Sequence, residues 1–357
     1  DRVERQMRIS PAGARTARWE LPPLAVFGDG SLDGVLADHG VGVTRVDSLA
    51  DADPDATPVL VVERNAIEPG STQHKDLERF VTAGGRALVL EQSASPLPQV
   101  GIDAKPAERV HIRGGRHCVL AGFAGEDLEF WGDEPYGLPD SDSWVVVSPY
   151  RKPDASAARV LIDSGWGSFG QGGMRWAPLI DAAVGDGLVI GCQLRLTDKG
   201  AEHPAAAKLL ERMLLHAANY APEPAASTAA TGRAAGYMAR LGFEPSAGGA
   251  DITIAEATSL DDAALKAQAE RVAGGGTAVV LGVDADSAER LSAAYGVEIE
   301  TVDLGPAYHL VRTGFDPLLD GISNQDTYWL DKAQYGSPDN VNRKMTDRLL
   351  RCAAGDD

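Results

Sequence analysis

The chain has 357 residues, 44% of them hydrophobic, a formal net charge of −19 and a sequence pI of about 4.7. This length suits two domains that each bury a core of their own. The acidic balance argues against nucleic acid and an anionic membrane surface as partners, because both need clustered Lys and Arg. No run approaches the ~18 apolar residues that span a bilayer. We therefore expect a soluble protein, and its compartment stays open.

The cysteines and histidines indicate no metal site. Cys118, Cys192 and Cys352 are far apart and form no C-x-x-C pair, which favours neither a zinc site nor a disulfide framework. The seven histidines show no H-E-x-x-H or other ligand spacing. His203 is expected as a helix cap and His216 as a surface residue. We expect no metal and no cofactor.

The amino-terminal part begins with charged and proline-rich residues 1–23, expected as a lead-in from an upstream part of a longer protein. A strand at 24–27 precedes Gly28-Asp29-Gly30, and a helix is expected at 31–39 with Ser31 as its N-cap. Because neither G-x-G-x-x-G nor G-K-[ST] completes the glycine loop, we favour no nucleotide site there. Two further strands are expected at 43–46 and 59–62.

The clearest unit of the sequence is a helix at 72–83, a stop at Gly84-Gly85 and an apolar strand at 86–90. This order is typical of a parallel sheet covered by helices on both faces. Such sheets bind ligands past the carboxyl ends of their strands, so the ligand-cleft candidates are Glu91, Gln92 and Ser93. Ser93 lacks the flanking glycines of a nucleophile elbow, which favours an ordinary turn residue.

The middle of the chain has short apolar runs separated by Gly, Pro and Asp, typical of partly antiparallel strands added to a parallel core. A buried strand is then expected at 188–194 and a helix at 204–219, where apolar residues recur at helical spacing. The short runs lie at 111–112, 118–120, 144–148 and 159–163.

The loop at 130–144 is the best candidate for contact with a sugar, since Trp131, Tyr136 and Trp144 would stack on a pyranose face. The preferred alternative is that the two tryptophans anchor the loop to the sheet, because Trp131 has a counterpart at Trp329. With 52 acidic residues, pairs such as Glu126/Asp127 and Asp140/Asp142 arise by chance, so no catalytic residue is assigned.

The second half repeats the pattern of the first. After a Pro/Ala/Ser/Thr-rich segment at 221–232, expected as a linker, come a helix at 233–240, a strand at 252–255, a helix at 261–272, glycines at 274–276 and a strand at 278–281. This predicts a tandem duplication with domains at 24–220 and 233–357, the second shorter or truncated. The strands 86–90 and 278–281 are expected to be central and buried, with 188–190 beside the first.

Several segments stand in a telling order: Leu88-Val89-Leu90-Glu91-Gln92, Leu120-Ala121-Gly122-Phe123 with Asp127 and Trp131, Pro178-Leu179-Ile180, 187–194 and 204–210. Together they resemble class I glutamine-amidotransferase-like domains of bacterial β-galactosidases and related glycoside hydrolases, which include trimerisation domains. The resemblance implies two flavodoxin-like α/β domains with mainly parallel sheets covered by helices on both faces. The elbows at 91–94 and 282–285 carry no Cys, so glutamine hydrolysis is not expected.

Two functions remain open. The first is a non-catalytic structural or accessory region of a larger β-galactosidase-like hydrolase, which supports a catalytic domain of the same or an associated protein, or a homo-oligomer, and contacts glycan. The second is a self-contained hydrolase that uses the cleft at the carboxyl end of the strand 86–90.

Overall fold

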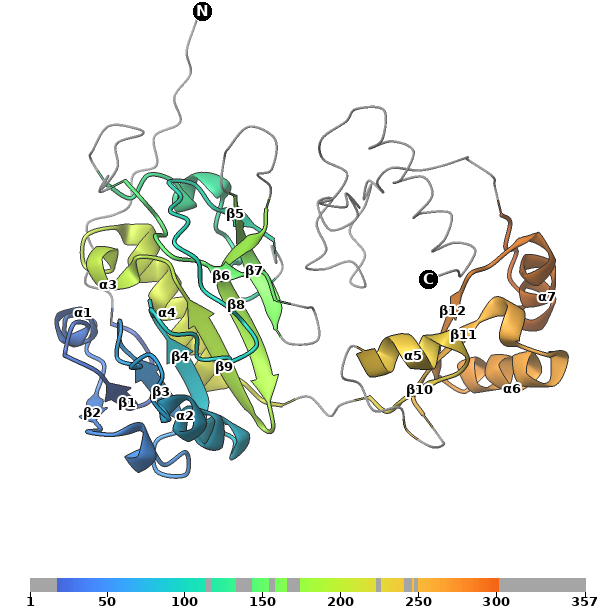
Figure 1. Ribbon diagram of the computed structural model, residues 1–357, viewed down its shortest axis with the longest axis horizontal. Coiled ribbons are helices and arrows are strands. Elements are labelled where there is room, and N and C mark those ends of the chain that lie inside the picture. Colours follow the sequence, from blue (N-terminus) through green and yellow to red (C-terminus); the bar gives the residue numbers. More distant parts are fainter. Residues whose placement is uncertain are drawn as a thin grey trace, which may run out of the picture. The chain divides into compact units, whose positions relative to one another are not determined.

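The computed structural model describes residues 18–113, 117–132, 143–153, 158–165, 174–222, 226–240, 246 and 250–301. The described residues up to Pro222 and those from Ala226 on belong to two compact units, and each is considered by itself. Figure 1 labels the helices and strands of both units. No helix among the described residues is long and apolar enough to cross a membrane. The sugar-contact candidate Tyr136 and the repeat residue Trp329 lie outside this description.

The first unit contains one mixed sheet in the order β2-β1-β3-β4-β9-β8-β7-β5, with β6 paired to β8. Strands β2, β1, β3, β4 and β9 are parallel to one another in this order. The other strands are antiparallel. The bounds are β1 Leu24–Phe27, β2 Val43–Arg45, β3 Val59–Val62, β4 Arg86–Val89, β5 His111–Ile112, β6 Tyr150–Arg151, β7 Arg159–Ser164, β8 Trp176–Val184 and β9 Gly187–Cys192.

Helices cover both faces of the parallel strands (Figure 1). Helices α1 (Asp33–Asp38) and α4 (Pro204–Asn219) pack on one face, in the core that holds Leu88 and Ile190. Helix α2 (Gln73–Thr82) packs on the other face, in a second core with Ala87 and Val89. Leu88 is fully buried and pairs with Ile190. The expectation that 86–90 is a central buried strand beside 188–190 is confirmed.

Three features of the first unit differ from the sequence analysis. The nine-residue strand β8, which pairs antiparallel with β9, was not expected; Pro178 and Asp181 interrupt its apolar pattern and hide it from sequence inspection. The run 118–120 lies in a turn. The N-cap of α1 is Leu32 and not Ser31, whose amide donates to the side chain of Asp29. The short helices are α3 Leu196–Lys199, η2 Leu49–Asp51 and η3 Gly125–Leu128.

The second unit contains a parallel three-stranded sheet in the order β10-β11-β12. Strand β10 lies within the segment 221–232, which the sequence analysis assigned to a linker. The elements are β10 Thr228–Ala230, α5 Arg233–Arg240, β11 Ile252–Glu256, η4 Ala257–Ser259, α6 Asp262–Ala273, β12 Thr277–Leu281 and α7 Ala285–Tyr295. That the two units are flavodoxin-like domains stays a prediction.

The expectation that 278–281 is a central buried strand is wrong for the described part of the chain. Strand β12 is the last strand of its sheet, and Val279 and Leu281 are 37% and 38% exposed. An apolar run indicates burial on two faces only when both faces receive a layer. Thr277, Val279 and Leu281 are exposed, whereas Ala278 and Val280 between them are half-buried, so one face of β12 is open.

The two units share one local arrangement. Glu63 directly follows β3, and Glu256 ends β11. In each unit a glycine with positive φ lies close to this carboxylate. Gly28, at +149°, follows β1, the parallel neighbour of β3, and Gly232, at +63°, follows β10, the parallel neighbour of β11. This correspondence agrees with the repeat read from the sequence, and the duplication itself stays a prediction.

Candidate functional site

The glycine loop after β1 is closed by a carboxylate of the same chain. Fully buried Glu63 accepts hydrogen bonds from the amides of Gly30 at 2.7 Å and Leu32 at 2.8 Å, and from Arg45 at 3.2 Å. A loop of inward-pointing amides is an anion site. A Cβ at Gly28 would lie 2.5 Å from the Cβ of Glu63, so the loop needs glycine there to hold this carboxylate. The loop thus binds an internal anion.

Glu91 lies at the carboxyl end of β4, as expected from the sequence. Its carboxylate accepts a hydrogen bond from the Thr197 amide at 3.1 Å and another from the Thr197 hydroxyl at 2.9 Å. Burial raises the pKa of Glu91 to about 7, against the opposite effect of the Thr197 hydrogen bonds. A carboxyl group with this pKa suits proton transfer near neutral pH.

Gln92 is buried and holds the bend after β4. Its side-chain amide donates to the carbonyls of Glu63 at 2.6 Å and Leu90 at 2.7 Å, and its oxygen accepts from the Ile67 amide at 3.0 Å. Gln193 brackets the Gln92 backbone: its side-chain oxygen accepts from the Gln92 amide at 2.7 Å, and its nitrogen donates to the Gln92 carbonyl at 2.9 Å. These contacts join the ends of β4 and β9.

Nucleophile candidates near this edge are poorly placed for attack. Ser93 is exposed. Cys192 at the end of β9 is fully buried, and burial raises the pKa of its thiol, which disfavours the reactive thiolate. The Tyr150 hydroxyl is buried without a hydrogen-bond partner among the described residues, and burial raises its pKa as well.

Of the aromatic candidates, Trp131 and Trp144 lie among the described residues, and the Trp131 amide donates to the Ser143 carbonyl, next to Trp144, at 3.2 Å. Trp131 is 3% exposed, donates through its indole nitrogen to the Asp127 carbonyl at 3.0 Å and stacks on His203, with ring centroids 5.6 Å apart. In this position its faces are covered by protein. Trp144 is half-buried, and its carbonyl accepts a hydrogen bond from Arg195 at 3.4 Å. Glycan contact by Trp131, Tyr136 and Trp144 stays a prediction.

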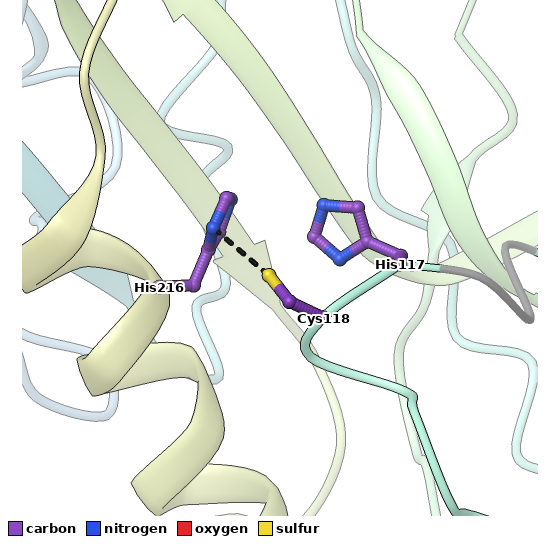
Figure 2. A group of neighbouring side chains, drawn as sticks. All are labelled: His117, Cys118 and His216. Atoms are coloured by element: carbon purple, nitrogen blue, oxygen red, sulfur yellow. Dashed lines mark hydrogen bonds between the residues drawn. The ribbon is translucent and has the colours of Figure 1, made fainter.

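A second polar cluster lies between the turn at 117–120 and α4, which covers one face of the sheet. It contains His117, Cys118 and His216, whose candidate ligand atoms all lie within 4.8 Å of one another. The Cys118 sulfur is 3.3 Å from Nδ1 of His216. Figure 2 shows this sulfur between the two imidazole rings. His216 is therefore not the surface residue expected from the sequence.

Asp181 of β8 faces both rings of this cluster from within the sheet. Its Oδ2 atom is 3.3 Å from Nε2 of His117 and 3.5 Å from Nε2 of His216. Arg159 donates to both oxygens of the same carboxylate, at 2.9 and 2.6 Å. Burial alone would raise the pKa of Asp181, but the hydrogen bonds from His117, His216 and Arg159 hold it well below its usual range.

Sequence inspection missed this cluster because its members are far apart in the chain. Cys118 and His216 are separated by 98 residues, and no local spacing joins them. Two weak signals were present: the adjacent His117-Cys118 pair, and an acidic residue, Asp181, in an otherwise apolar segment. Neither signal predicts the partner on α4.

Comparisons with known proteins give partial structural likenesses. No protein-family model matches the sequence, and no curated protein matches it. A ThuA-like protein from Parabacteroides merdae is similar at 12% identity and a TM-score of 0.37, over 58% of this chain and 93% of that one. A β-galactosidase from Rahnella sp. R3 is similar at 15% identity and a TM-score of 0.33, over 55% of this chain and 32% of that one.

The exo-β-1,4-mannosidase Op5Man5 from an Opitutaceae bacterium is similar at 14% identity and a TM-score of 0.34, over 58% of this chain and 37% of the mannosidase. The chain thus spans about a third of the length of these two glycoside hydrolases. At such identities and TM-scores the likeness assigns no activity to this chain.

Proposed function

We propose that the first unit is a non-catalytic accessory domain of a larger β-galactosidase-like hydrolase. It would support the catalytic domain of the same or an associated protein, or a contact between copies of the chain. The order of short segments that resembles amidotransferase-like domains of β-galactosidases supports this assignment. The elbow after β4 reads Glu91-Gln92-Ser93-Ala94, without the cysteine that amidotransferases carry at this place.

The observation that carries the proposal is the closure of the edge where a ligand would bind. The Glu63 carboxylate occupies the amides of the glycine loop. The side-chain amides of Gln92 and Gln193 form hydrogen bonds with backbone groups of this chain. A substrate site instead directs a few polar groups into a cavity. Opening this edge for a substrate would break several buried hydrogen bonds. Each buried polar group left without a partner costs about 1–3 kcal/mol of stability.

The experiment is an assay of the full chain with glutamine and with aryl glycosides, alongside sedimentation analysis of its oligomeric state. We expect no turnover of either substrate. Turnover that disappears in Glu91→Gln, but persists in the exposed-site control Glu68→Gln, would overturn the non-catalytic assignment. A strictly monomeric chain would remove the contact between copies and leave support of a catalytic domain as the accessory role.

The second candidate is a self-contained hydrolase with Glu91 as general acid or base. The raised pKa of Glu91, about 7, favours it. As a general acid, Glu91 would make activity fall as the pH rises through about 7; as a general base, it would make activity fall as the pH drops through about 7. Since the Thr197 hydrogen bonds lower the pKa, the Thr197→Val variant would move the inflection to higher pH. A pH profile that Thr197→Val leaves in place would exclude Glu91 as the titrating group.

A further inference from the structure

We propose that His117, Cys118 and His216 form a binding site for one zinc-type divalent metal ion, with Asp181 orienting both imidazole rings. The proposal is independent of the accessory role argued above. It concerns the face of the sheet under α4, whereas that role was argued from the strand ends.

The distances between the candidate ligand atoms suit a single ion. Zinc binds cysteine sulfur at about 2.3 Å and histidine nitrogen at about 2.0–2.1 Å, so tetrahedral geometry places such atoms roughly 3.5 Å apart. The sulfur of Cys118 and Nδ1 of His216 are 3.3 Å apart, and the third ligand atom completes a group within 4.8 Å. An ion would therefore need only small side-chain adjustments.

The carboxylate behind the rings is the usual partner of metal-bound histidines. A ligating imidazole commonly directs its other nitrogen to a carboxylate, which fixes the ring and raises its basicity. Here one oxygen of Asp181 faces Nε2 of both rings, at 3.3 and 3.5 Å. Nδ1 of His216 faces the Cys118 sulfur, and Nδ1 of His117 has a long, 3.4 Å contact with the Val119 amide. Arg159 also lies 2.9 Å from Nε2 of His117, so an ion on Nδ1, which places the ring proton on Nε2, requires Arg159 to turn to Asp181 alone.

The supporting residues hold the site in place. Asp181 is 2% exposed, lies on a strand paired on both sides, and is fixed by two hydrogen bonds from Arg159. Arg212 of α4 donates to the Cys118 carbonyl at 3.0 Å, which ties the turn to the helix. Cys118 is exposed, so an ion has a path from solvent and room for a water as fourth ligand.

The donor set selects the class of metal. One thiolate and two imidazoles suit zinc and its substitute cobalt(II), whereas calcium and magnesium prefer oxygen ligands. Arg159 balances the charge of Asp181, so the thiolate is the anionic ligand that the ion would meet directly.

The first test uses the full chain, stripped with a chelator and titrated with cobalt(II) and zinc. We expect one ion per chain and an absorption band from thiolate-to-cobalt charge transfer, displaced by zinc and unaffected by magnesium or calcium. Cys118→Ser should remove the band, and His216→Gln should weaken binding at least ~10-fold. The matched control His111→Gln, at an exposed position on β5, should bind like the wild type.

The second test separates positioning from stability. Asp181→Asn should weaken zinc binding ~10–100-fold. Arg159→Gln should weaken it less than Asp181→Asn, because it loosens the hydrogen bonds that fix Asp181 but keeps the carboxylate and removes a positive charge near the ion. Equal weakening by both variants would overturn the orienting role of Asp181. Wild-type binding no tighter than that of Cys118→Ser, or a wild-type cobalt complex without the thiolate band, would overturn the metal site itself.

Discussion

Glu91 accepts two hydrogen bonds from the single residue Thr197, one from its amide at 3.1 Å and one from its hydroxyl at 2.9 Å. The contact ties the end of β4 to α3, across 106 residues of sequence. Burial makes ionisation of this carboxylate costly and raises its pKa from 4.5 to about 7. The same group therefore links folding stability to pH.

The first prediction is a loss of stability as pH rises. Between its unfolded pKa of 4.5 and its folded pKa of about 7, Glu91 holds a proton in the folded state that the unfolded chain releases. Its favourable contribution is present at low pH and is lost as pH rises through that window, by up to about 3 kcal/mol. Urea unfolding at about pH 5 and about pH 8 measures this loss.

The Glu91→Gln variant should lack this part of the pH dependence and should be more stable than the wild type above neutral pH. The exposed-site variant Glu68→Gln should keep the wild-type slope. An identical slope in Glu91→Gln and the wild type would mean that Glu91 is ionised in the folded protein throughout this range.

The second prediction compares two strands that look alike in sequence. Leu88→Ala should cost ~2–5 kcal/mol, because the side chain is fully buried between layers. Val279→Ala should cost less than about 1 kcal/mol, because Val279 is 37% exposed. Urea unfolding, followed separately for the transition of each unit, measures both. A large loss at Val279 would mean that a further layer covers β12 in solution.

These two strands also show how far local pattern predicts this fold. The helix, the Gly84-Gly85 stop and the apolar run predicted β4 correctly, because each signal is local and the strand lies between two neighbours. The same signals preceded β12, and there the expected burial was wrong. Whether a layer covers the second face depends on distant parts of the chain, which an apolar run does not specify.

The polar groups of the candidate site were predictable only in part. Position at the end of β4 identified Glu91 and Gln92, since strand ends follow from strand bounds. Their partners Thr197 and Gln193 are more than 100 residues away in the chain. The strand β9 that lies beside β4 is equally distant in sequence, so local pattern does not predict these contacts. Glu63 was missed because it looks like an ordinary acidic residue after a strand. Only the tertiary fold brings it to the amides of Gly30 and Leu32.

The third prediction concerns this internal anion. Glu63→Ala leaves the buried Leu32 amide and the part-buried Gly30 amide without their acceptor and removes one partner of Arg45, which keeps Asp33; it should destabilise the chain by ~2–4 kcal/mol. The vacated loop should then bind a small anion, so sulfate should raise the melting temperature of Glu63→Ala more than that of the wild type. Glu63→Gln, which keeps one acceptor oxygen in place, is the control with a smaller sulfate effect. Equal effects in all three proteins would show that the loop collapses without the carboxylate.

The fourth prediction tests Gln193, whose side chain brackets the backbone of Gln92 with hydrogen bonds of 2.7 and 2.9 Å and also donates to the Ser148 carbonyl at 2.7 Å. Gln193→Ala leaves these buried groups unpaired and should cost about 1–3 kcal/mol. Amide hydrogen exchange should accelerate at Gln92, while the amides of β4 stay protected. The exposed-site variant Gln99→Ala should change neither quantity. Unchanged exchange at Gln92 in Gln193→Ala would mean that another group, such as water, replaces the side chain, and the closure of this strand end would then not depend on Gln193.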